Sequence, residues 1–232
     1  MNRLYLFFKR CFDLFLSLLT LTMLSPFFLV AAVAIKLSSP GPVFYRTERI
    51  GRGRKPFVLY KFRSMHVYHP EVGSEKKTEG GYIANGSRIF PFGAFLRKSK
   101  LDELPQFLNI LLGQMSVIGP RPITPAGVAK HYVGAYANVT SVRPGLACLD
   151  SLFDYAHGEL FVKNEEQYVR EVVPVRNCLA SMYVEKRTIG LDLYCIYRTI
   201  LLMIEVVVLK KKNFSYTHYE QEARNLVFNI QK

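Results

Sequence analysis

The sequence has no tryptophan, and reactive side chains are scarce: five histidines, four cysteines and five aspartates in 232 residues. The cysteines show neither CxxC spacing nor histidines at zinc-site intervals, so neither a disulfide scaffold nor a zinc site is favoured. They are predicted to be reduced thiols in the core: Cys11, Cys148, Cys178 and Cys195. The histidines form no HExxH or triad-like spacing, and we expect surface or core positions for them: His66, His69, His131, His157 and His218.

Negative charge is also scarce. The chain has 31 Lys and Arg against 18 Asp and Glu, a formal net charge of +13. Such an excess needs an anionic partner, which composition alone leaves open as nucleic acid, a phosphorylated substrate or anionic lipid. With half of its residues apolar, a chain of this length suffices for one domain, or for a domain plus an anchor, and is neither collagen-like nor disordered.

Charge is absent altogether from the 22 residues Leu14–Ile35. As a straight helix this run would span roughly 33 Å, about one bilayer core. It is longer than the apolar region of about 7–15 residues in a signal peptide, which disfavours a cleaved leader. The two readings left open are a spanning anchor and a segment that enters the membrane and returns.

Basic residues flank the run on both sides: Lys9 and Arg10 before it, and Lys36, Arg46, Arg49, Arg52, Arg54 and Lys55 after it. The positive-inside rule then places both ends in the same compartment. Ser25 and Pro26, in the middle, predict a break, because proline removes a backbone donor and clashes with the preceding turn. These features favour re-entry, although a proline can also merely kink a spanning helix. Asp13, at the mouth of the run, is expected near the lipid headgroups with Arg10 as its partner.

A turn cluster, SSPGP at 38–42, ends the apolar run. The expected organisation is a membrane helix over 1–38, a basic domain over 39–212 and a peripheral tail over 213–232. Aromatic and β-branched residues predict a strand over 57–65 that puts Leu59, Lys61 and Arg63 on one face.

A polar, Gly-rich and mobile loop is expected over 66–87, over or beside a site. Helices are expected over 99–112, 124–137, 165–185 with a kink or break at Pro174, and 191–209. The first of them starts either at Ser99 or nearer Pro105. The last is predicted to be amphipathic, lying on a membrane surface or packed in the core.

Two adjacent carboxylates, Asp102 and Glu103, stand in the segment LRKSKLDELPQFLNILLG, among Arg97, Lys98 and Lys100. Nearby cations favour ionised carboxylates, and an Asp-Glu pair supplies the oxygen ligands that Mg²⁺ prefers. For the pair taken alone, a purely structural role is favoured over metal binding, since acidic residues are enriched in the first turns of helices. The pair alone therefore leaves metal binding and helix capping open.

Rigid turns present two arginines nearby in the sequence. In IGPRP, Arg121 is held between two prolines, so little ordering entropy is lost when it binds. In VRPG, Arg143 is expected in a type II turn. Guanidinium forks suit the paired oxygens of a diphosphate. GRGRK at 51–55 lacks the third glycine and the following helix of a dinucleotide fingerprint, so we expect a basic surface loop there.

Six motifs cover about residues 9–147: KRCFDLF, SSPGPVFYRTERIG, YKFRSM, LRKSKLDELPQFLNIL, GQMSVIGPRP and VRPGL. In this order and spacing they resemble the bacterial sugar transferase family, the monotopic phosphoglycosyl transferases. The resemblance implies an α+β fold with an N-terminal re-entrant helix hairpin and a small mixed α/β catalytic domain with amphipathic interfacial helices. It also implies a location at the cytoplasmic face of the bacterial inner membrane.

The resemblance further implies a reaction. A phospho-sugar moves from a nucleotide diphosphate sugar, expected to be a UDP-sugar, to a polyprenol phosphate, with Mg²⁺ as cofactor. This step would start the assembly of a membrane glycan such as an exopolysaccharide, O-antigen, capsule or glycoprotein glycan. The implied partners are these two substrates and an anionic phospholipid membrane, without nucleic acid, and a homo-oligomer is left open.

Matching motif positions imply roles for individual residues. Asp102 would be the nucleophile that forms a covalent phospho-sugar intermediate, and Asp102 with Glu103 would hold the metal. The positions implied to contact substrate or to support such contacts are Lys61, Arg63, Arg97, Arg121, Arg143 and Asp192.

The sequence departs from the family pattern after Arg143, where LACLDSL replaces the usual threonine-glycine-tryptophan-glutamine type of sequence. Gly190 stands where an aromatic is usual, Gln114 where an acid is usual, and Phe90 where a threonine is usual. None of these changes touches the two carboxylates, so they bear on sugar and nucleotide specificity. The alternatives are a membrane-tethered anion-binding module, which leaves the carboxylates unexplained, and a non-catalytic scaffold.

Overall fold

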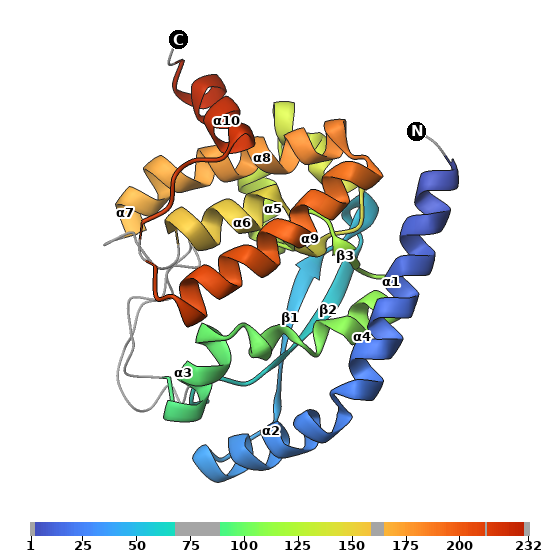
Figure 1. Ribbon diagram of the computed structural model, residues 1–232, viewed down its shortest axis with the longest axis vertical. Coiled ribbons are helices and arrows are strands. Elements are labelled where there is room, and N and C mark those ends of the chain that lie inside the picture. The colour runs from blue at the N-terminus through green and yellow to red at the C-terminus, as the bar shows by residue number, and fades with distance from the viewer. Residues whose placement is uncertain (1–2, 68–88, 159–164, 212, 230–232) are drawn as a thin grey trace.

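A computed structural model of the chain describes residues 3–67, 89–158, 165–211 and 213–229 (Figure 1). Within these residues, α-helices are combined with two-stranded sheets, which confirms the expected mixture of helix and strand. The predicted loop over 66–87 lies outside the described residues from position 68 onward. The strands are β1 Phe44–Ile50, β2 Pro56–Phe62, β3 Ser116–Ile118 and β4 Gly145–Ala147. The helices are α1 Arg3–Met23, α2 Ser25–Ser38, α3 Pro91–Lys98, α4 Gln106–Leu111, α5 Pro125–His131, α6 Leu149–Phe153, α7 Glu165–Gln167, α8 Val173–Lys186, α9 Ile189–Met203 and α10 His218–Phe228.

The first two helices form a pair bent by 60°. The bend lies at Leu24, and Pro26 occupies the first turn of α2, where its missing N–H breaks no helical hydrogen bond. Ser25 Oγ donates to the Thr22 carbonyl oxygen at 2.9 Å. The predicted break is therefore confirmed as a bend. Among the described residues no single helix is long and apolar enough to cross a membrane, whereas this bent pair meets that criterion jointly.

The inner face of α1 packs on α4 and β3. Asp13 is buried, and its Oδ1 accepts hydrogen bonds from the Val117 N–H at 2.8 Å and from Ser116 Oγ at 3.0 Å. Arg10 donates instead to the carbonyl oxygens at the end of α4, those of Ile110 and Leu111. The expectation that Arg10 is the partner of Asp13 is wrong, because donors of β3 hold the carboxylate and Arg10 bonds to α4. The depth of Asp13 relative to the lipid headgroups stays a prediction.

β1 and β2 pair antiparallel, with Phe44 opposite Phe62 and Ile50 opposite Pro56. The strand predicted over 57–65 is confirmed as far as Phe62. Arg63 lies beyond it and does not share the face of Lys61 in the strand. Its buried guanidinium donates to the carbonyl oxygens of Ser39 and Pro40 at 2.6 Å each, so it ties the end of α2 to the end of β2.

The predicted helices are found with changed boundaries. The helix over 99–112 is reduced to α4, in agreement with the start near Pro105, and Ser99 instead bonds back to the Phe95 carbonyl of α3. The helix over 124–137 becomes α5 followed by a 3-10 segment, Gly134–Ser141. Pro174 does not break the third helix, because it falls in the first turn of α8 after a π-helical segment. The fourth is confirmed as α9, continued by π-helical turns at Ile204–Val208.

The main hydrophobic core lies between β2, β3 and the helices α6, α8 and α9, with Leu59 and Leu179 almost fully buried. A second cluster joins α2 to the end of β2 and to α3, through Ile35, Phe62 and Leu96. Aromatic contacts reinforce this cluster, since the Phe62 ring is stacked on that of Phe44. The second cluster fixes α3, and the segment that follows it, against the N-terminal helix pair.

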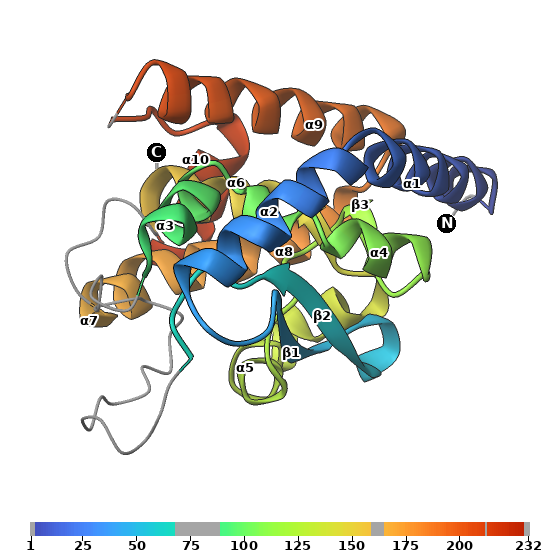
Figure 2. The same cartoon turned by 90° about the horizontal axis from the view of Figure 1, so that it is seen from below.

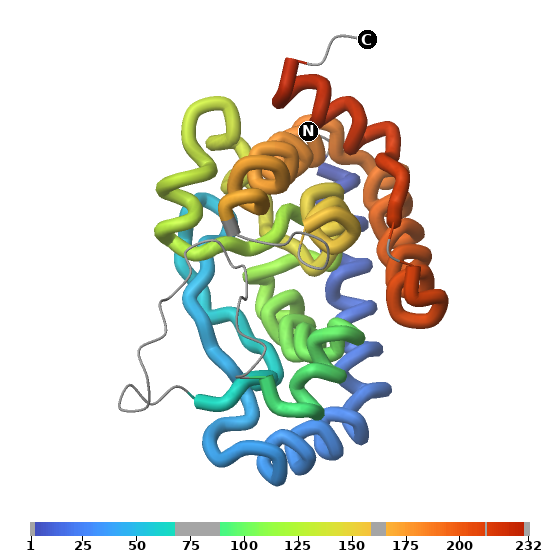
Figure 3. Tube along the Cα trace, turned by 90° about the vertical axis from the view of Figure 1, so that its left-hand side faces the viewer, coloured from blue at the N-terminus to red at the C-terminus, as the bar shows by residue number. Residues whose placement is uncertain are grey.

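α9 lies on the side of the molecule opposite the β1–β2 hairpin (Figures 2 and 3). Its inner face is buried through Leu191 and Cys195. Its outer face carries an exposed apolar stripe that continues into the π-helical turns: Ile189, Leu193, Tyr197, Ile200, Ile204 and Val208. The helix is amphipathic as predicted, and contact of this stripe with a membrane stays a prediction.

The predicted tail contains α10, which packs against α8 and α6 with Ala223 fully buried. The limits of the three predicted regions stay predictions.

All four cysteines are free. Cys148, Cys178 and Cys195 are buried as predicted, but Cys11 is exposed. The reason is the helical period: α1 turns the residues at 10 and 13 inward, so the side chain at 11 points away from the core.

Candidate active site

The two adjacent carboxylates lie in a 3-10 turn between α3 and α4, η3 (Leu101–Glu103). α3 ends because Lys100 adopts a left-handed backbone conformation with φ of 56°, which residues other than glycine rarely adopt. Gly93 lies so close to the chain after β2 that a Cβ atom there would be 2.0 Å from the Ser64 carbonyl oxygen. α3 is therefore packed tightly against the chain that follows β2. This contact fixes the position at which the turn with the two carboxylates begins.

The two carboxylates differ in their partners. Glu103 Oε1 accepts from Lys61 Nζ of β2 at 2.8 Å. Asp102 is 6% exposed, and its Oδ1 has no hydrogen-bond partner within the described residues. A buried oxygen without a donor costs free energy, so proteins usually avoid it. The Asp102 carboxylate is therefore buried with one oxygen that no described residue engages.

The charges around the pair push their pKa values apart. Burial raises the pKa of Asp102, and Glu103 adds to the rise, while Lys61, Lys100 and Arg97 oppose it. Burial acts in the same direction on Glu103. There, however, Lys61, Lys100 and Arg121 outweigh it and lower the pKa to about 2. Glu103 is thus ionised throughout the physiological range, and Asp102 is the more basic carboxylate.

Asn109 fixes α4 to the edge of β2. Its buried side chain donates to the Val58 carbonyl oxygen at 2.7 Å and accepts from the Tyr60 N–H at 3.1 Å. Its Nδ2 also donates to Gln114 Oε1 at 2.7 Å. Lys61 follows Tyr60 in β2. The hydrogen bonds of Asn109 therefore fix the distance between Lys61 and the turn that carries Asp102 and Glu103.

The structure brings part of the predicted set together. Lys61, Arg97 and Arg121 act electrostatically on the Asp102–Glu103 pair, and Lys100 joins them. The Arg121 backbone N–H is held by Asp150 Oδ2 at 2.9 Å. Within the described residues, the candidate active site therefore comprises Asp102 and Glu103 with the four cations Lys61, Arg97, Lys100 and Arg121.

Three predicted residues lie elsewhere. Arg63 is committed to the carbonyl groups described above. Arg143 donates through Nε to the Gly113 carbonyl oxygen, beyond the far end of α4. Asp192, in the first turn of α9, accepts from Lys9 at 2.7 Å, Tyr5 at 2.9 Å and Tyr183 at 2.6 Å. These contacts favour structural roles, and a direct substrate contact by any of the three stays a prediction.

The sequence-based set lacked two residues that shape the site. Lys100 was visible only as one of several neighbouring cations, and nothing in its identity signals a left-handed backbone. Asn109 was overlooked as an ordinary polar residue. Its place in an otherwise apolar helix was the available signal, since a buried amide needs fixed partners.

The carboxylates are suited to a magnesium ion held jointly with a substrate. Mg²⁺ commonly binds one or two carboxylates and completes its shell with phosphates and water. Glu103 is ionised and Asp102 has an uncommitted oxygen, so the donor chemistry fits. Among the described residues no cluster of three or more His, Cys, Asp or Glu could hold a metal by itself.

Comparison with known proteins decides the family. The sequence profile described as bacterial sugar transferase matches residues 4–206. The chain belongs to this family. The match runs from α1 into the π-helical turns after α9 and so includes the candidate active site.

Relatives within the bacterial sugar transferases include exopolysaccharide production protein PSS of Rhizobium leguminosarum bv. phaseoli, 48% identical over 146 residues, which are 61% of this chain and 71% of that one. The UDP-glucose:undecaprenyl-phosphate glucose-1-phosphate transferase of Klebsiella pneumoniae is 34% identical over 203 residues, or 86% of this chain and 41% of that one. Exopolysaccharide production protein ExoY of Rhizobium meliloti (strain 1021) is 33% identical over 202 residues, 83% of each chain. The chain thus spans less than half the length of the Klebsiella relative.

Proposed function

We propose that this protein transfers a sugar 1-phosphate from a UDP-sugar to undecaprenyl phosphate through a covalent intermediate on Asp102. One observation carries the proposal: in a bacterial sugar transferase, a buried carboxylate with an uncommitted Oδ1 is surrounded by cations. The substrates follow the names of relatives such as the Klebsiella protein. The product would start the assembly of an exopolysaccharide or a related membrane glycan.

Two displacements at one phosphorus make up the reaction. First, the Asp102 carboxylate attacks the phosphorus that carries the sugar, and the bond from that phosphorus to the bridging oxygen breaks. UMP leaves with the electron pair. Next, an oxygen of undecaprenyl phosphate attacks the same phosphorus, its bond to Asp102 breaks, and the free carboxylate returns. A difficult transfer is thereby divided into two easier steps.

The surrounding residues supply position and charge. Asp102 is almost completely buried, so its carboxylate has little hydration to lose before it attacks. Lys61, Lys100, Arg97 and Arg121 provide positive charge for the phosphoryl oxygens as their charge shifts toward the leaving group. Phosphoryl transfer depends mainly on such positioning and charge neutralisation.

Mg²⁺ is the proposed cofactor, with Asp102 and Glu103 as its protein ligands. When bound, it would neutralise the diphosphate and stabilise the charge that develops on UMP. The low pKa of Glu103 supports this role, because a carboxylate that stays ionised binds a cation without first losing a proton.

The proposed location is the cytoplasmic face of the bacterial inner membrane, entered by α1 and α2 as a re-entrant pair. The bend between these helices supports it, as do exposed apolar side chains along both helices: Phe7, Phe15, Leu18, Met23, Leu29, Val30 and Leu37. Arg3→Cys and Tyr45→Cys in a cysteine-free background should both be protected from an impermeant thiol reagent in intact cells. Labelling of the N-terminal probe alone would show a spanning helix.

The transferase proposal is tested by UMP release from a panel of UDP-sugars. Protein in detergent should release UMP when undecaprenyl phosphate and Mg²⁺ are present, and Asp102→Asn should abolish release while the fold is kept. A wild-type protein that releases no UMP with any sugar would favour a scaffold. Release by Asp102→Asn near the wild-type rate would overturn the covalent mechanism.

A further inference from the structure

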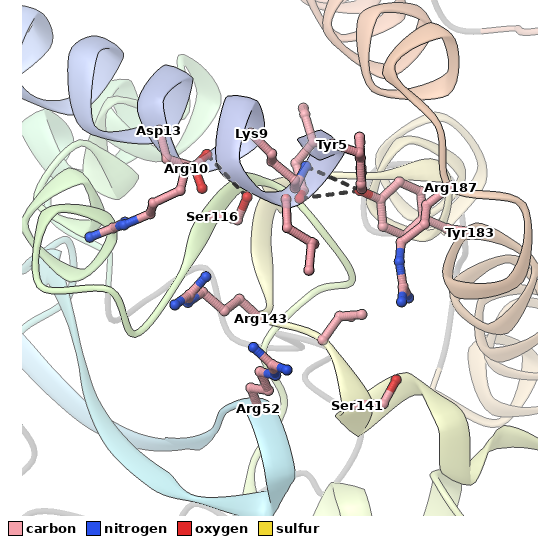
Figure 4. A pocket seen from close by; sticks show the side chains of 13 residues that line it. Tyr5, Lys9, Arg10, Asp13, Arg52, Ser116, Ser141, Arg143, Tyr183 and Arg187 are labelled. Atoms are coloured by element: carbon pink, nitrogen blue, oxygen red, sulfur yellow. Dashed lines mark hydrogen bonds between the residues drawn. The ribbon is translucent and has the colours of Figure 1, made fainter. Parts of the chain in front are cut away.

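A second polar site lies where the first half of α1 meets the connection between β1 and β2 and the segment before β4 (Figure 4). It is a pocket of about 50 Å³. On this measure a single water needs about 10–15 Å³, so the pocket has room for a few waters or one tetrahedral oxyanion. It is separate from the candidate active site, because the carboxylate turn precedes α4 and this pocket lies at the other end of that helix.

The lining of the pocket is strongly basic. Five cationic side chains line it, against one carboxylate, that of Asp13: Lys9, Arg10, Arg52, Arg143 and Arg187. The charge of Lys9 is matched by Asp192 at 2.7 Å. Asp13 is already engaged by donors of β3. Within the described residues, neither carboxylate forms an ion pair with Arg52 or Arg143.

Arg52 and Arg143 reach into the same space from two segments far apart in the sequence (Figure 4). Arg143 uses Nε to hold the Gly113 carbonyl oxygen at 2.8 Å, and no other hydrogen bond of its side chain is found within the described residues. The exposed side chain of Arg52 makes none there. Both guanidinium groups thus keep N–H donors available to a ligand.

The positive charges of the arginines in the pocket repel one another. Burial lowers the pKa of Arg143, the charges of Arg10 and Arg52 lower it further, and Asp13 only partly offsets them. An arrangement that gathers guanidinium groups in this way is destabilised without an anion and stabilised with one.

A purely structural explanation covers part of the cluster. Arg10 and Arg143 both hold carbonyl groups at the end of α4, which needs donors there. Arg52 has no such function. Its position beside two other arginines is explained by a shared anionic ligand, which makes Arg52 the residue on which the two explanations differ.

We propose that this pocket binds a phosphate-class oxyanion, held by Arg52 and Arg143 at the end of α4 remote from Asp102. A phosphate group fits the volume, and its several oxygens accept from more than one guanidinium fork at once. Either a lipid headgroup or the diphosphate of a nucleotide has this chemistry. The inference does not require the transferase reaction, because it concerns binding alone.

The test uses the full chain in a neutral detergent and inorganic phosphate as the probe. The thermal unfolding midpoint, followed by circular dichroism, is titrated against phosphate and against chloride at matched ionic strength. Arg52→Gln removes one pocket cation, and Lys55→Gln is the matched control. Lys55 carries the same charge in the same connection but does not line the pocket.

Phosphate should raise the midpoint of the wild type and of Lys55→Gln in a saturable way, and Arg52→Gln should need at least about tenfold more phosphate, the loss typical of one charge-assisted hydrogen bond. Equal titrations for the two variants would overturn the proposal, and they would be seen if phosphate bound only near Asp102. A rise no larger than that with chloride would overturn it as well.

Two further arms identify the source of the oxyanion. The titration is repeated with UDP, and the midpoints are compared in nanodiscs of phosphatidylcholine with and without phosphatidylglycerol. A deficit of Arg52→Gln relative to Lys55→Gln with UDP assigns the pocket to a nucleotide. A deficit that appears with phosphatidylglycerol assigns it to a lipid headgroup. If Arg52→Gln shows its deficit with phosphate but matches Lys55→Gln in both of these arms, the pocket takes free phosphate and neither of these two sources.

Discussion

Glu103→Gln should destabilise the protein, because the charge it removes is stabilised by the surrounding cations. The pKa of this carboxyl falls from an ordinary 4.5 to about 2 in the fold. At 1.36 kcal/mol per unit the shift corresponds to about 3 kcal/mol. The Glu103 side chain is 19% exposed, so screening by water reduces the figure to about 2 kcal/mol. For a chain of this length we expect the unfolding midpoint to fall by roughly 4–8 °C at neutral pH.

Asp102→Asn should have the opposite effect on stability. Burial raises the pKa of Asp102 above its ordinary 3.8, so the ionised form is disfavoured by the fold. Replacing it by a neutral side chain of the same shape should raise the midpoint at neutral pH, even though activity is lost. The two substitutions should thus shift the unfolding midpoint in opposite directions, although they alter adjacent carboxylates. This difference is a specific consequence of the charges around the pair.

The pH dependence of the unfolding midpoint tests the direction of each of these two effects independently. The contribution of Glu103 is complete above pH 4.5 and is lost as the pH falls towards 2, so Glu103→Gln should approach the wild type in acid. The advantage of Asp102→Asn should also vanish as the pH falls through the raised pKa of Asp102, since protonation removes the buried charge. Thermal unfolding by circular dichroism between neutral and acid pH measures both.

Glu166→Gln is the control for loss of one acidic charge, because Glu166 is exposed on the surface. Its midpoint should match the wild type. If Glu103→Gln were as stable as this control, Lys61, Lys100 and Arg121 would not be stabilising the carboxylate, and the electrostatic account of the site would be refuted.

Arg121→Lys should raise the KM for the UDP-sugar by about tenfold, because lysine lacks the planar fork that a diphosphate accepts; unchanged steady-state kinetics would return Arg121 to a structural role. Glu103→Gln should raise the Mg²⁺ concentration for half-maximal activity, and a titration equal to the wild type would remove it from the ligand set. Gly93→Ala should lose about 1–3 kcal/mol in thermal unfolding through its clash with the Ser64 carbonyl. Gly190→Ala, whose nearest atom would be 3.8 Å away, is the matched control, and equal midpoints would contradict the packing argument.

Local sequence signals predicted the parts of the structure that local physics decides. The helix over the apolar run is interrupted just before Pro26, where the proline ring itself restricts the backbone. The strand around Leu59 and the amphipathic helix around Cys195 follow from the period of their apolar residues. The adjacent carboxylates were identified because acids are rare and stand here among cations.

The sequence could not predict features that depend on distant partners. Arg63 was expected beside Lys61, but the carbonyl groups that bury it lie 23 and 24 residues upstream. Asp192 is held by Lys9 from 183 residues away. The left-handed backbone of Lys100 ends α3 early, and no property of lysine indicates it. Such contacts form only when the fold is complete, so residue type and spacing carry no signal for them.

The covalent step on Asp102 is tested most directly by isotope exchange in the absence of undecaprenyl phosphate. Labelled UMP is incubated with the protein, Mg²⁺ and the UDP-sugar that supports turnover. A reversible first displacement predicts that label enters the UDP-sugar without the lipid acceptor, and that Asp102→Asn shows no exchange. If label entered only when undecaprenyl phosphate was present, although the same sample released UMP with that acceptor, the sugar phosphate would pass directly between substrates and Asp102 would not be the nucleophile.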